Sequence, residues 1–191
     1  RRNIHRLEKG LIMQPRRVSF GDDYIVETVI AFTKAVSAEC LSDEELKWFT
    51  DVLCEYFSVV KDTPKISEAR GIFFTNRGSP GDSDTPLAIP FSHDTLPPST
   101  VDYDALRSLC LRRRSVRWFK DQPVPMNLIE KAVQLAALAP SACNRQPYSF
   151  YVSSSKLKAV EMLKHAGGTI GFAENVPCAI AVIGNLSAYP F

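Results

Sequence analysis

The chain has 191 residues, of which 45% are hydrophobic and 23% charged, and this ordinary composition excludes a disordered or fibrous protein. Its 23 Lys and Arg against 21 Asp and Glu leave a net charge of +2, too balanced to indicate a nucleic-acid partner. No apolar run reaches the roughly 18 residues that a membrane-spanning helix needs, and no apolar signal core follows the first basic residues. We therefore expect a cytoplasmic protein with no membrane partner.

The cysteines and histidines indicate no metal site. The five cysteines are widely spaced and contain no C-x-x-C pair, and the three histidines are scattered, which argues against a disulfide framework and against zinc. The chain begins with Arg1 rather than Met and stops at Phe191 just after a predicted strand, so we also expect it to be a fragment.

The first third of the chain is predicted to be helical. Apolar residues of segment 22–37 recur at helical spacing, and a second helix is predicted from Ser42, where Ser42 and Glu45 have the form of a capping box. We assign residues 1–74 to a helical N-terminal domain. Segment 75–100 is rich in Gly and Pro, which cannot sustain a helix or a central strand, and is predicted to be a linker.

The remaining residues, 101–191, alternate between helices and strands. Helices are predicted over 101–113, 126–138 and 155–165, and strands over 148–153 and 178–183. The buried stripe of the second helix is expected to comprise Ile129, Ala132, Val133 and Ala136. The second strand is a continuous apolar run of the fully buried kind.

Two segments have side chains suited to a cofactor. In Arg113-Arg114-Ser115-Val116-Arg117, guanidinium groups and a hydroxyl match the oxygens of a phosphate. The alternative is a solvated charged face or a surface patch for membranes or nucleic acids. In segment 139–148, small residues would let a flat ring approach the backbone, and Asn144 and Gln146 offer donors and acceptors. The alternative there is a helix stop followed by a turn.

Taken together, the run from Arg113 to Val152 resembles the opening of the FMN-dependent nitroreductase family. The family pattern of R-R-S-x-R-x-F, then P-V, a helix ending in A-P-S, N-x-Q-P-W/Y and a strand stands here as RRSVRWF, PVP, LAPSACNRQPY and SFYV. The resemblance implies an α+β nitroreductase-like fold over residues 101–191, incomplete at its C-terminus and preceded by the helical domain.

The resemblance also implies roles for the basic segment. Arg113 and Ser115 match the residues that hold the FMN phosphate and ribityl chain, with Arg114 nearby. Arg117 matches the basic residue that approaches the pyrimidine edge of the flavin, where a cation would stabilise the negative charge of the reduced ring.

The second segment is implied to act across a subunit interface. Pro140, Ser141 and Ala142 match the residues that pack against FMN from the partner subunit, and Asn144 lies just beyond them. The resemblance thus implies a homodimer with FMN at the subunit interface. Tyr148 stands where Trp is common, and Thr169 is a weak match for a later polar contact. Cys143 is interpreted as a packing residue rather than a redox group, and the glycines of segment 167–171 as a turn.

The N-terminal segment 2–11 resembles an extension of nitroreductase-like proteins from bacterial polysaccharide gene clusters. The alternative is a first helix capped by Gly10, with His5 and Glu8 as a surface pair.

The resemblance implies an FMN-dependent oxidoreductase that passes electrons from NAD(P)H to a nitroaromatic, a quinone or a similar small molecule by a ping-pong mechanism. No side chain is nominated as catalytic, because the flavin supplies the chemistry. Reductive dehalogenation is an alternative in the same fold. A non-catalytic interaction module associated with polysaccharide biosynthesis is an alternative of another class.

Overall fold

The computed structural model describes residues 1–77, 85–153 and 155–186. The chain forms two compact units, Arg1–Pro97 and Pro98–Phe191, and their boundary falls within the predicted linker 75–100. Residues 78–84 of that linker lie outside the described residues. None of the helices in the described residues is long and apolar enough to cross a membrane.

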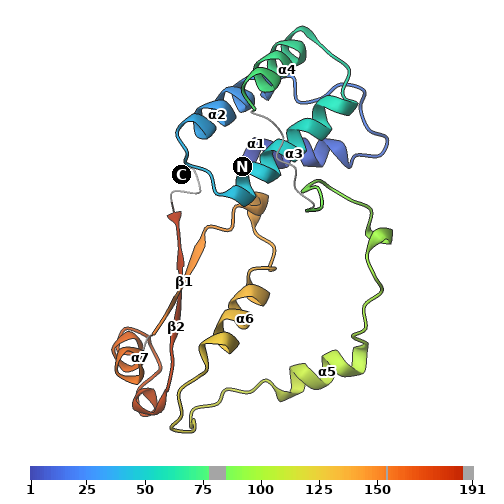
Figure 1. The fold of residues 1–191 in the computed structure, drawn as a ribbon. Helices are drawn as coiled ribbons and strands as arrows, with labels where there is room; N and C mark the ends of the chain where they lie inside the picture. Colours follow the sequence, from blue (N-terminus) through green and yellow to red (C-terminus); the bar gives the residue numbers. More distant parts are fainter. Residues whose placement is uncertain (78–84, 154, 187–191) are drawn as a thin grey trace. The chain divides into compact units, whose positions relative to one another are not determined.

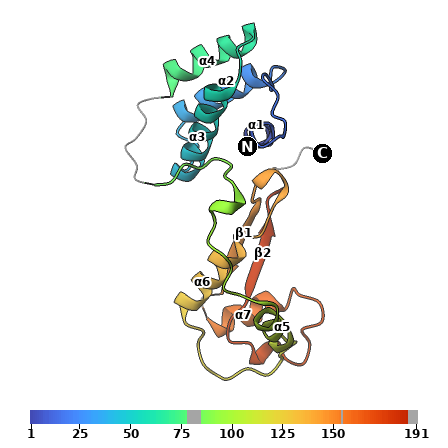
Figure 2. The same cartoon turned by 90° about the vertical axis from the view of Figure 1, so that its right-hand side faces the viewer.

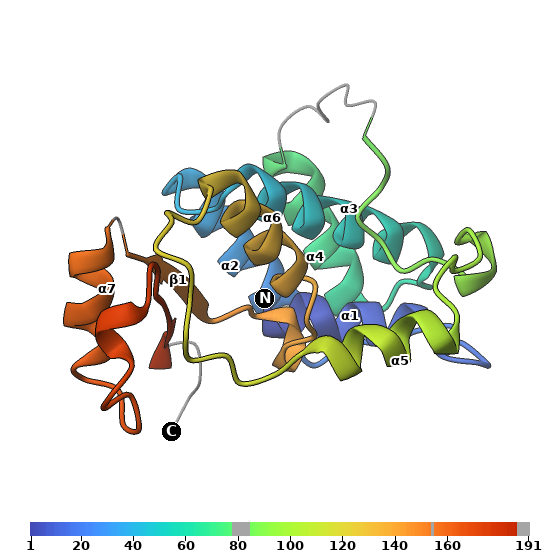
Figure 3. The ribbon, with the colours of Figure 1, turned by 90° about the horizontal axis from the view of Figure 1, so that it is seen from below.

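In the described residues, the first unit is built mainly from four α-helices (Figures 1 and 3). They are α1 (Arg2–Leu11), α2 (Ile25–Ser37), α3 (Asp43–Val59) and α4 (Pro64–Asn76). Helix α2 packs along α4, while α1 packs along α3. The helices predicted from periodicity over 22–37 and from Ser42 are therefore confirmed, each with a start within a few residues of the expected one.

Capping residues fix where α3 and α4 begin. The Ser42 hydroxyl accepts a hydrogen bond from the Glu45 amide at 3.2 Å, and Glu45 Oε2 accepts one from the Ser42 amide at 3.3 Å, so the predicted capping box is confirmed. Helix α4 was not predicted as a separate element. Its N-cap is Thr63, whose hydroxyl accepts from the Ile66 amide at 3.2 Å, and Pro64 occupies the first helical position.

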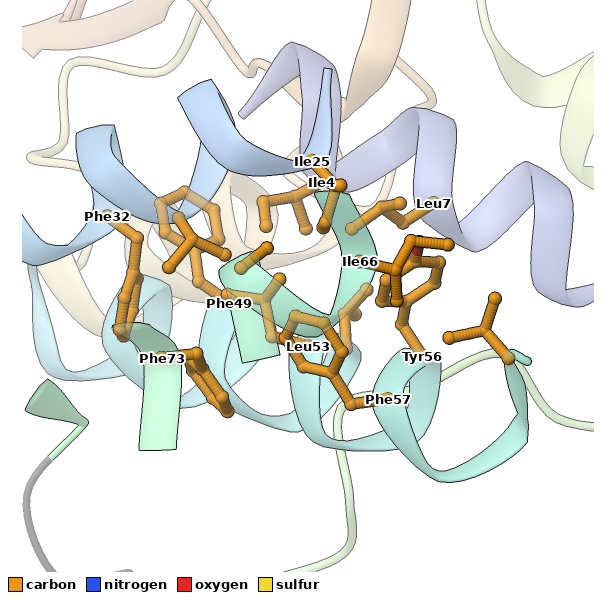
Figure 4. Packing of buried hydrophobic residues seen from close by; sticks show 14 residues of the cluster. Ile4, Leu7, Ile25, Phe32, Phe49, Leu53, Tyr56, Phe57, Ile66 and Phe73 are labelled. Atoms are coloured by element: carbon orange, nitrogen blue, oxygen red, sulfur yellow. The ribbon is translucent and has the colours of Figure 1, made fainter. Parts of the chain in front are cut away.

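Aromatic and aliphatic side chains from all four helices fill one core (Figure 4). The ring of Phe73 lies 5.6 Å from that of Phe32 and 5.5 Å from that of Phe57, measured between centroids. Tyr56 is fully buried, and its hydroxyl donates a hydrogen bond of 2.6 Å to the carbonyl of Phe20. Burial of this aromatic cluster is the main stabilising contribution to the unit.

Part of the Pro-rich segment is attached to this unit. The Ala88 amide donates to Asp51 Oδ2 at 2.8 Å, and the Ile89 side chain packs against the core. A short helix, η1 (His93–Thr95), follows.

The first helix differs from expectation at its end. Helix α1 continues to Leu11, so Gly10 lies inside the helix rather than capping it. The Phe20 ring occupies the space that a Cβ at position 10 would need. The predicted surface pair is confirmed, with His5 Nδ1 3.2 Å from Glu8 Oε2, and Glu8 Oε1 also accepts a hydrogen bond of 2.7 Å from Trp48 Nε1.

Where it is described, the second unit combines helices with a two-stranded sheet (Figures 1 and 2). Its elements are α5 (Tyr103–Arg112), α6 (Met126–Ala136), η2 (Ala142–Asn144), β1 (Tyr148–Val152), α7 (Lys156–Leu163), η3 (Ala173–Asn175) and β2 (Ile180–Gly184). The strands are antiparallel, and Phe150 pairs with Val182 at the centre of the ladder. The fold is thus helix-rich with a small sheet, as the α+β class requires.

Two burial predictions for this unit are wrong. Strand β2 is not fully buried, because Val182 and Ile183 are 63% and 53% exposed. In α6 only Ile129 of the predicted stripe is buried, while Ala132 and Ala136 are exposed and Val133 is half-buried. An apolar pattern shows which face of an element is suited to burial, but burial also needs another layer packed against that face. In the described residues the sheet has only two strands, and much of β2 and α6 is exposed.

Candidate functional site

The basic segment begins where α5 ends. The Asp102 side chain caps the start of α5 by accepting from the Ala105 amide at 2.8 Å. At Arg113 the backbone turns to an extended conformation, with φ −64° and ψ 119°, so the helix stops and the following residues are presented to solvent. Four predicted site residues of this segment are exposed: Arg113, Arg114, Ser115 and Arg117.

Arg113, Arg114 and Arg117 take part in no ion pair in the described residues. Arg114 Nη1 donates only within the segment, to the carbonyl of Arg113 at 3.0 Å. Guanidinium groups without carboxylate partners, beside a serine hydroxyl, suit the phosphate of a cofactor. The donor set therefore fits the group that the sequence implied.

Within the basic segment, Arg117 is held by contacts with a distant loop. Asn175 Nδ2 donates a hydrogen bond of 2.6 Å to the Arg117 carbonyl, and the guanidinium carbon of Arg117 lies 5.9 Å from the centroid of the Phe172 ring. Both partners come from the loop around η3. Sequence reasoning identified neither Asn175 nor Phe172, and no local motif marks them.

The second predicted segment forms a tight turn after α6. The Ser141 hydroxyl accepts from the Gln146 amide at 2.9 Å, and Gln146 Nε2 donates to the Ala137 carbonyl at 3.2 Å. Three residues here have positive φ: Cys143 at 54°, Asn144 at 47° and Gln146 at 44°. Left-handed backbone at non-glycine residues is costly and gathers at functional sites, so this turn is a candidate for ligand contact.

Within the second unit, the segment that precedes α6 and the turn that follows it lie at opposite ends of that helix (Figures 1 and 2). The structure therefore does not bring Arg113, Ser115 and Arg117 together with Pro140, Ser141 and Ala142 in one pocket of the second unit.

Two further sequence interpretations concern the loop after α7. The Thr169 hydroxyl donates to the carbonyls of Leu163 and Ala166, at 2.9 and 3.0 Å, so it closes the end of α7. Gly168 and Gly171 have φ of 78° and 91°, which confirms that the glycine-rich segment is a turn.

A hollow of about 860 Å³ lies between this loop and Trp118. Its lining includes Lys164, His165 and Phe172, and the Trp118 ring is 77% exposed. The hollow thus combines aromatic surfaces with two basic side chains and the acidic side chain of Glu174, and Trp118 follows Arg117 in the sequence.

An exposed ion pair joins the segment before α6 to the start of α7. Lys156 Nζ lies 2.8 Å from Asp121 Oδ1. The hydrogen bond from Lys156, together with its positive charge, lowers the pKa of Asp121.

Residues 111–176 match the model of the Nitroreductase family. The chain is 38% identical over 84 residues to a putative NADH dehydrogenase/NAD(P)H nitroreductase of Archaeoglobus fulgidus, covering 41% of this chain and 46% of that protein. It is 35% identical over 80 residues to a 4-nitrobenzoate reductase of Pseudomonas putida, covering 42% of this chain and 32% of that protein. It is 36% identical over 66 residues to mouse iodotyrosine deiodinase 1, covering 34% of this chain and 23% of the deiodinase.

Residues 111–176 of this chain are therefore a segment similar to the nitroreductase family, and two of the similar proteins are named as reductases. The chain spans less than half the length of each of these relatives. No solved structure matches it.

Proposed function

We propose that the protein is an FMN-dependent oxidoreductase that passes electrons from NAD(P)H to a small organic acceptor. The observation that carries the proposal is that Arg113, Arg114 and Arg117, within the segment that matches the family, are exposed and have no carboxylate partner in the described residues. When bound, FMN would take a hydride from NAD(P)H and deliver two electrons to the acceptor in a separate, ping-pong half-reaction.

The residues of this chain would bind and tune that cofactor. Arg113 and Ser115 would hold the phosphate and ribityl chain, with Arg114 adding positive charge. Arg117, fixed by Asn175 and Phe172, would lie at the pyrimidine edge of the ring and stabilise negative charge there. No side chain is required to act as an acid or a base.

A site shared between two copies of the chain would explain how both the basic segment and the turn at 140–146 could contact one cofactor. Because the basic segment and the turn at 140–146 lie at opposite ends of α6, we propose that Pro140, Ser141, Ala142 and Asn144 serve a cofactor held by the basic segment of a second copy. A homodimer with two FMN sites at the interface follows from this proposal.

The hollow beside Trp118 supports an aromatic or quinone-like acceptor, since its lining offers the rings of Trp118 and Phe172 for stacking, with the charged groups of Lys164 and Glu174 at its edge. The deiodinase similarity favours reductive dehalogenation as a second candidate reaction. Both would use the same cofactor site, so the acceptor distinguishes them.

The test is the FMN dissociation constant, measured by flavin fluorescence. Arg113→Ala should weaken binding by about 1.5–3 kcal/mol, roughly 10- to 150-fold, as expected for a lost charged hydrogen bond. The matched control is Arg107→Ala, an exposed arginine on α5 outside the motif, which should leave the constant unchanged. Equal FMN dissociation constants for Arg113→Ala and the wild type would contradict the proposed role of Arg113 in binding the phosphate.

A further inference from the structure

The loop that joins α1 to α2 presents basic and apolar side chains together. Residues 12–18 are all exposed, with Ile12, Met13 and Val18 at 59%, 57% and 74%. Arg16 and Arg17 lie between them, and residues 9–18 contain no Asp or Glu. Figure 1 shows this segment as a blue loop between α1 and α2.

Three contacts fix both ends of the loop. The Phe20 ring packs directly against the backbone of Gly10, and Tyr56 donates a hydrogen bond to the Phe20 carbonyl. The Lys61 amide donates to the Val18 carbonyl at 2.7 Å. The exposed side chains are therefore held on a closed loop anchored in the core, so little ordering entropy remains to be lost on binding.

Two of the acidic side chains that flank the loop, those of Glu8 and Asp22, already have partners, while Asp23 is exposed. Glu8 accepts hydrogen bonds from Trp48 and pairs with His5, and Asp22 accepts one from the Thr63 hydroxyl. Lys61, whose backbone is bonded to Val18, is exposed and adds a further cation. The loop is therefore locally cationic although the whole chain is close to neutral.

We propose that this loop binds an anionic lipid surface, with Arg16 and Arg17 at the lipid phosphates and the apolar side chains inserted at the interface. The charge of the loop calls for an anionic partner. Its apolar side chains are more than half exposed and do not line the hollow formed by residues of α1, α2 and α3, so they protrude rather than form part of that hollow. A bilayer interface buries protruding apolar groups without a matching pocket, and basic residues add electrostatic attraction.

This proposal replaces the sequence-based expectation of no membrane partner. It concerns surface contact rather than a membrane-spanning helix, which none of the described helices could form, and it does not depend on the flavin. Attachment at a membrane surface would place the second unit close to lipid-soluble acceptors.

Co-sedimentation of the full chain with phosphatidylcholine vesicles, with and without phosphatidylserine, tests the proposal. Arg16→Glu with Arg17→Glu should weaken binding to the anionic vesicles by roughly 30-fold or more, the loss expected for two basic contacts. Met13→Ser with Val18→Ser should weaken binding without a change of charge. Lys131→Glu with Lys158→Glu, exposed in the second unit, makes the same charge change as the arginine variant and should bind like the wild type.

Thermal melts establish that each variant is folded. Binding that requires phosphatidylserine and falls in both loop variants supports the proposal. Absent binding, or equal binding by the loop variants and the wild type, overturns it. Loss of binding in the arginine variant alone, with full competition by poly-glutamate, would also overturn it, because the loop would then be a contact for an acidic polypeptide.

Discussion

Asn175 donates a hydrogen bond of 2.6 Å from Nδ2 to the backbone carbonyl of Arg117, joining residues 58 positions apart. The bond fixes the backbone of the basic segment from outside it. Asn175→Ala should loosen Arg117 and weaken FMN binding by about 1 kcal/mol, roughly fivefold. The measurement is a flavin titration.

Glu174→Ala is the matched control for this prediction, since Glu174 is the exposed neighbour of Asn175. An equal change in both variants would mean that the loop, rather than this one bond, determines binding.

Two adjacent phenylalanines test the core of the first unit. Phe73 is fully buried between the rings of Phe32 and Phe57, whereas Phe74 is 45% exposed. Phe73→Ala should lower the free energy of unfolding by about 3–5 kcal/mol, because it leaves a cavity. Phe74→Ala should cost much less, and chemical denaturation compares the two. Similar losses would contradict the packing described.

Tyr56 makes stability depend on pH at the alkaline end. Burial of the hydroxyl, aided by nearby Tyr24 and Asp22, raises the pKa of Tyr56 well above its usual value. In the unfolded chain this tyrosine ionises near pH 10, so above about pH 10 the unfolded state binds fewer protons and stability falls as pH rises. Denaturation at a series of pH values should show this slope.

Tyr56→Phe should flatten that slope while lowering stability at neutral pH by about 1 kcal/mol, since the hydrogen bond to Phe20 is lost. An unchanged slope in the variant would assign the alkaline sensitivity to another group.

Local chemistry made much of this fold predictable from the sequence. The capping box of α3 uses residues three positions apart, and helical periodicity marks α2, α5, α6 and α7. Helix α4 has a similar start signal, an N-cap Thr63 followed by Pro64, but it was not predicted as a separate element. Burial was harder to predict, because the exposure of β2 depends on what covers it rather than on its own residues.

Prediction of the candidate site was limited in the same way, to features that are local in the sequence. The arginines were found because they are adjacent in sequence. Asn175 and Phe172 were not found, because their role comes from a contact that only the fold creates. The turn with positive φ at Cys143 and Gln146 was not found either. Gln146 closes it by donating from its amide to the Ser141 hydroxyl and from Nε2 to the Ala137 carbonyl, and no residue-type preference reveals these contacts.

The visible spectrum of the purified protein, recorded before and after anaerobic addition of NADH or NADPH, tests the central claim most directly. We predict flavin absorption bands, present as purified or after addition of FMN, that bleach with the reductant and return with an electron acceptor. A protein that binds no flavin, or holds flavin that neither nucleotide reduces, would contradict the claim and favour the non-catalytic interaction module.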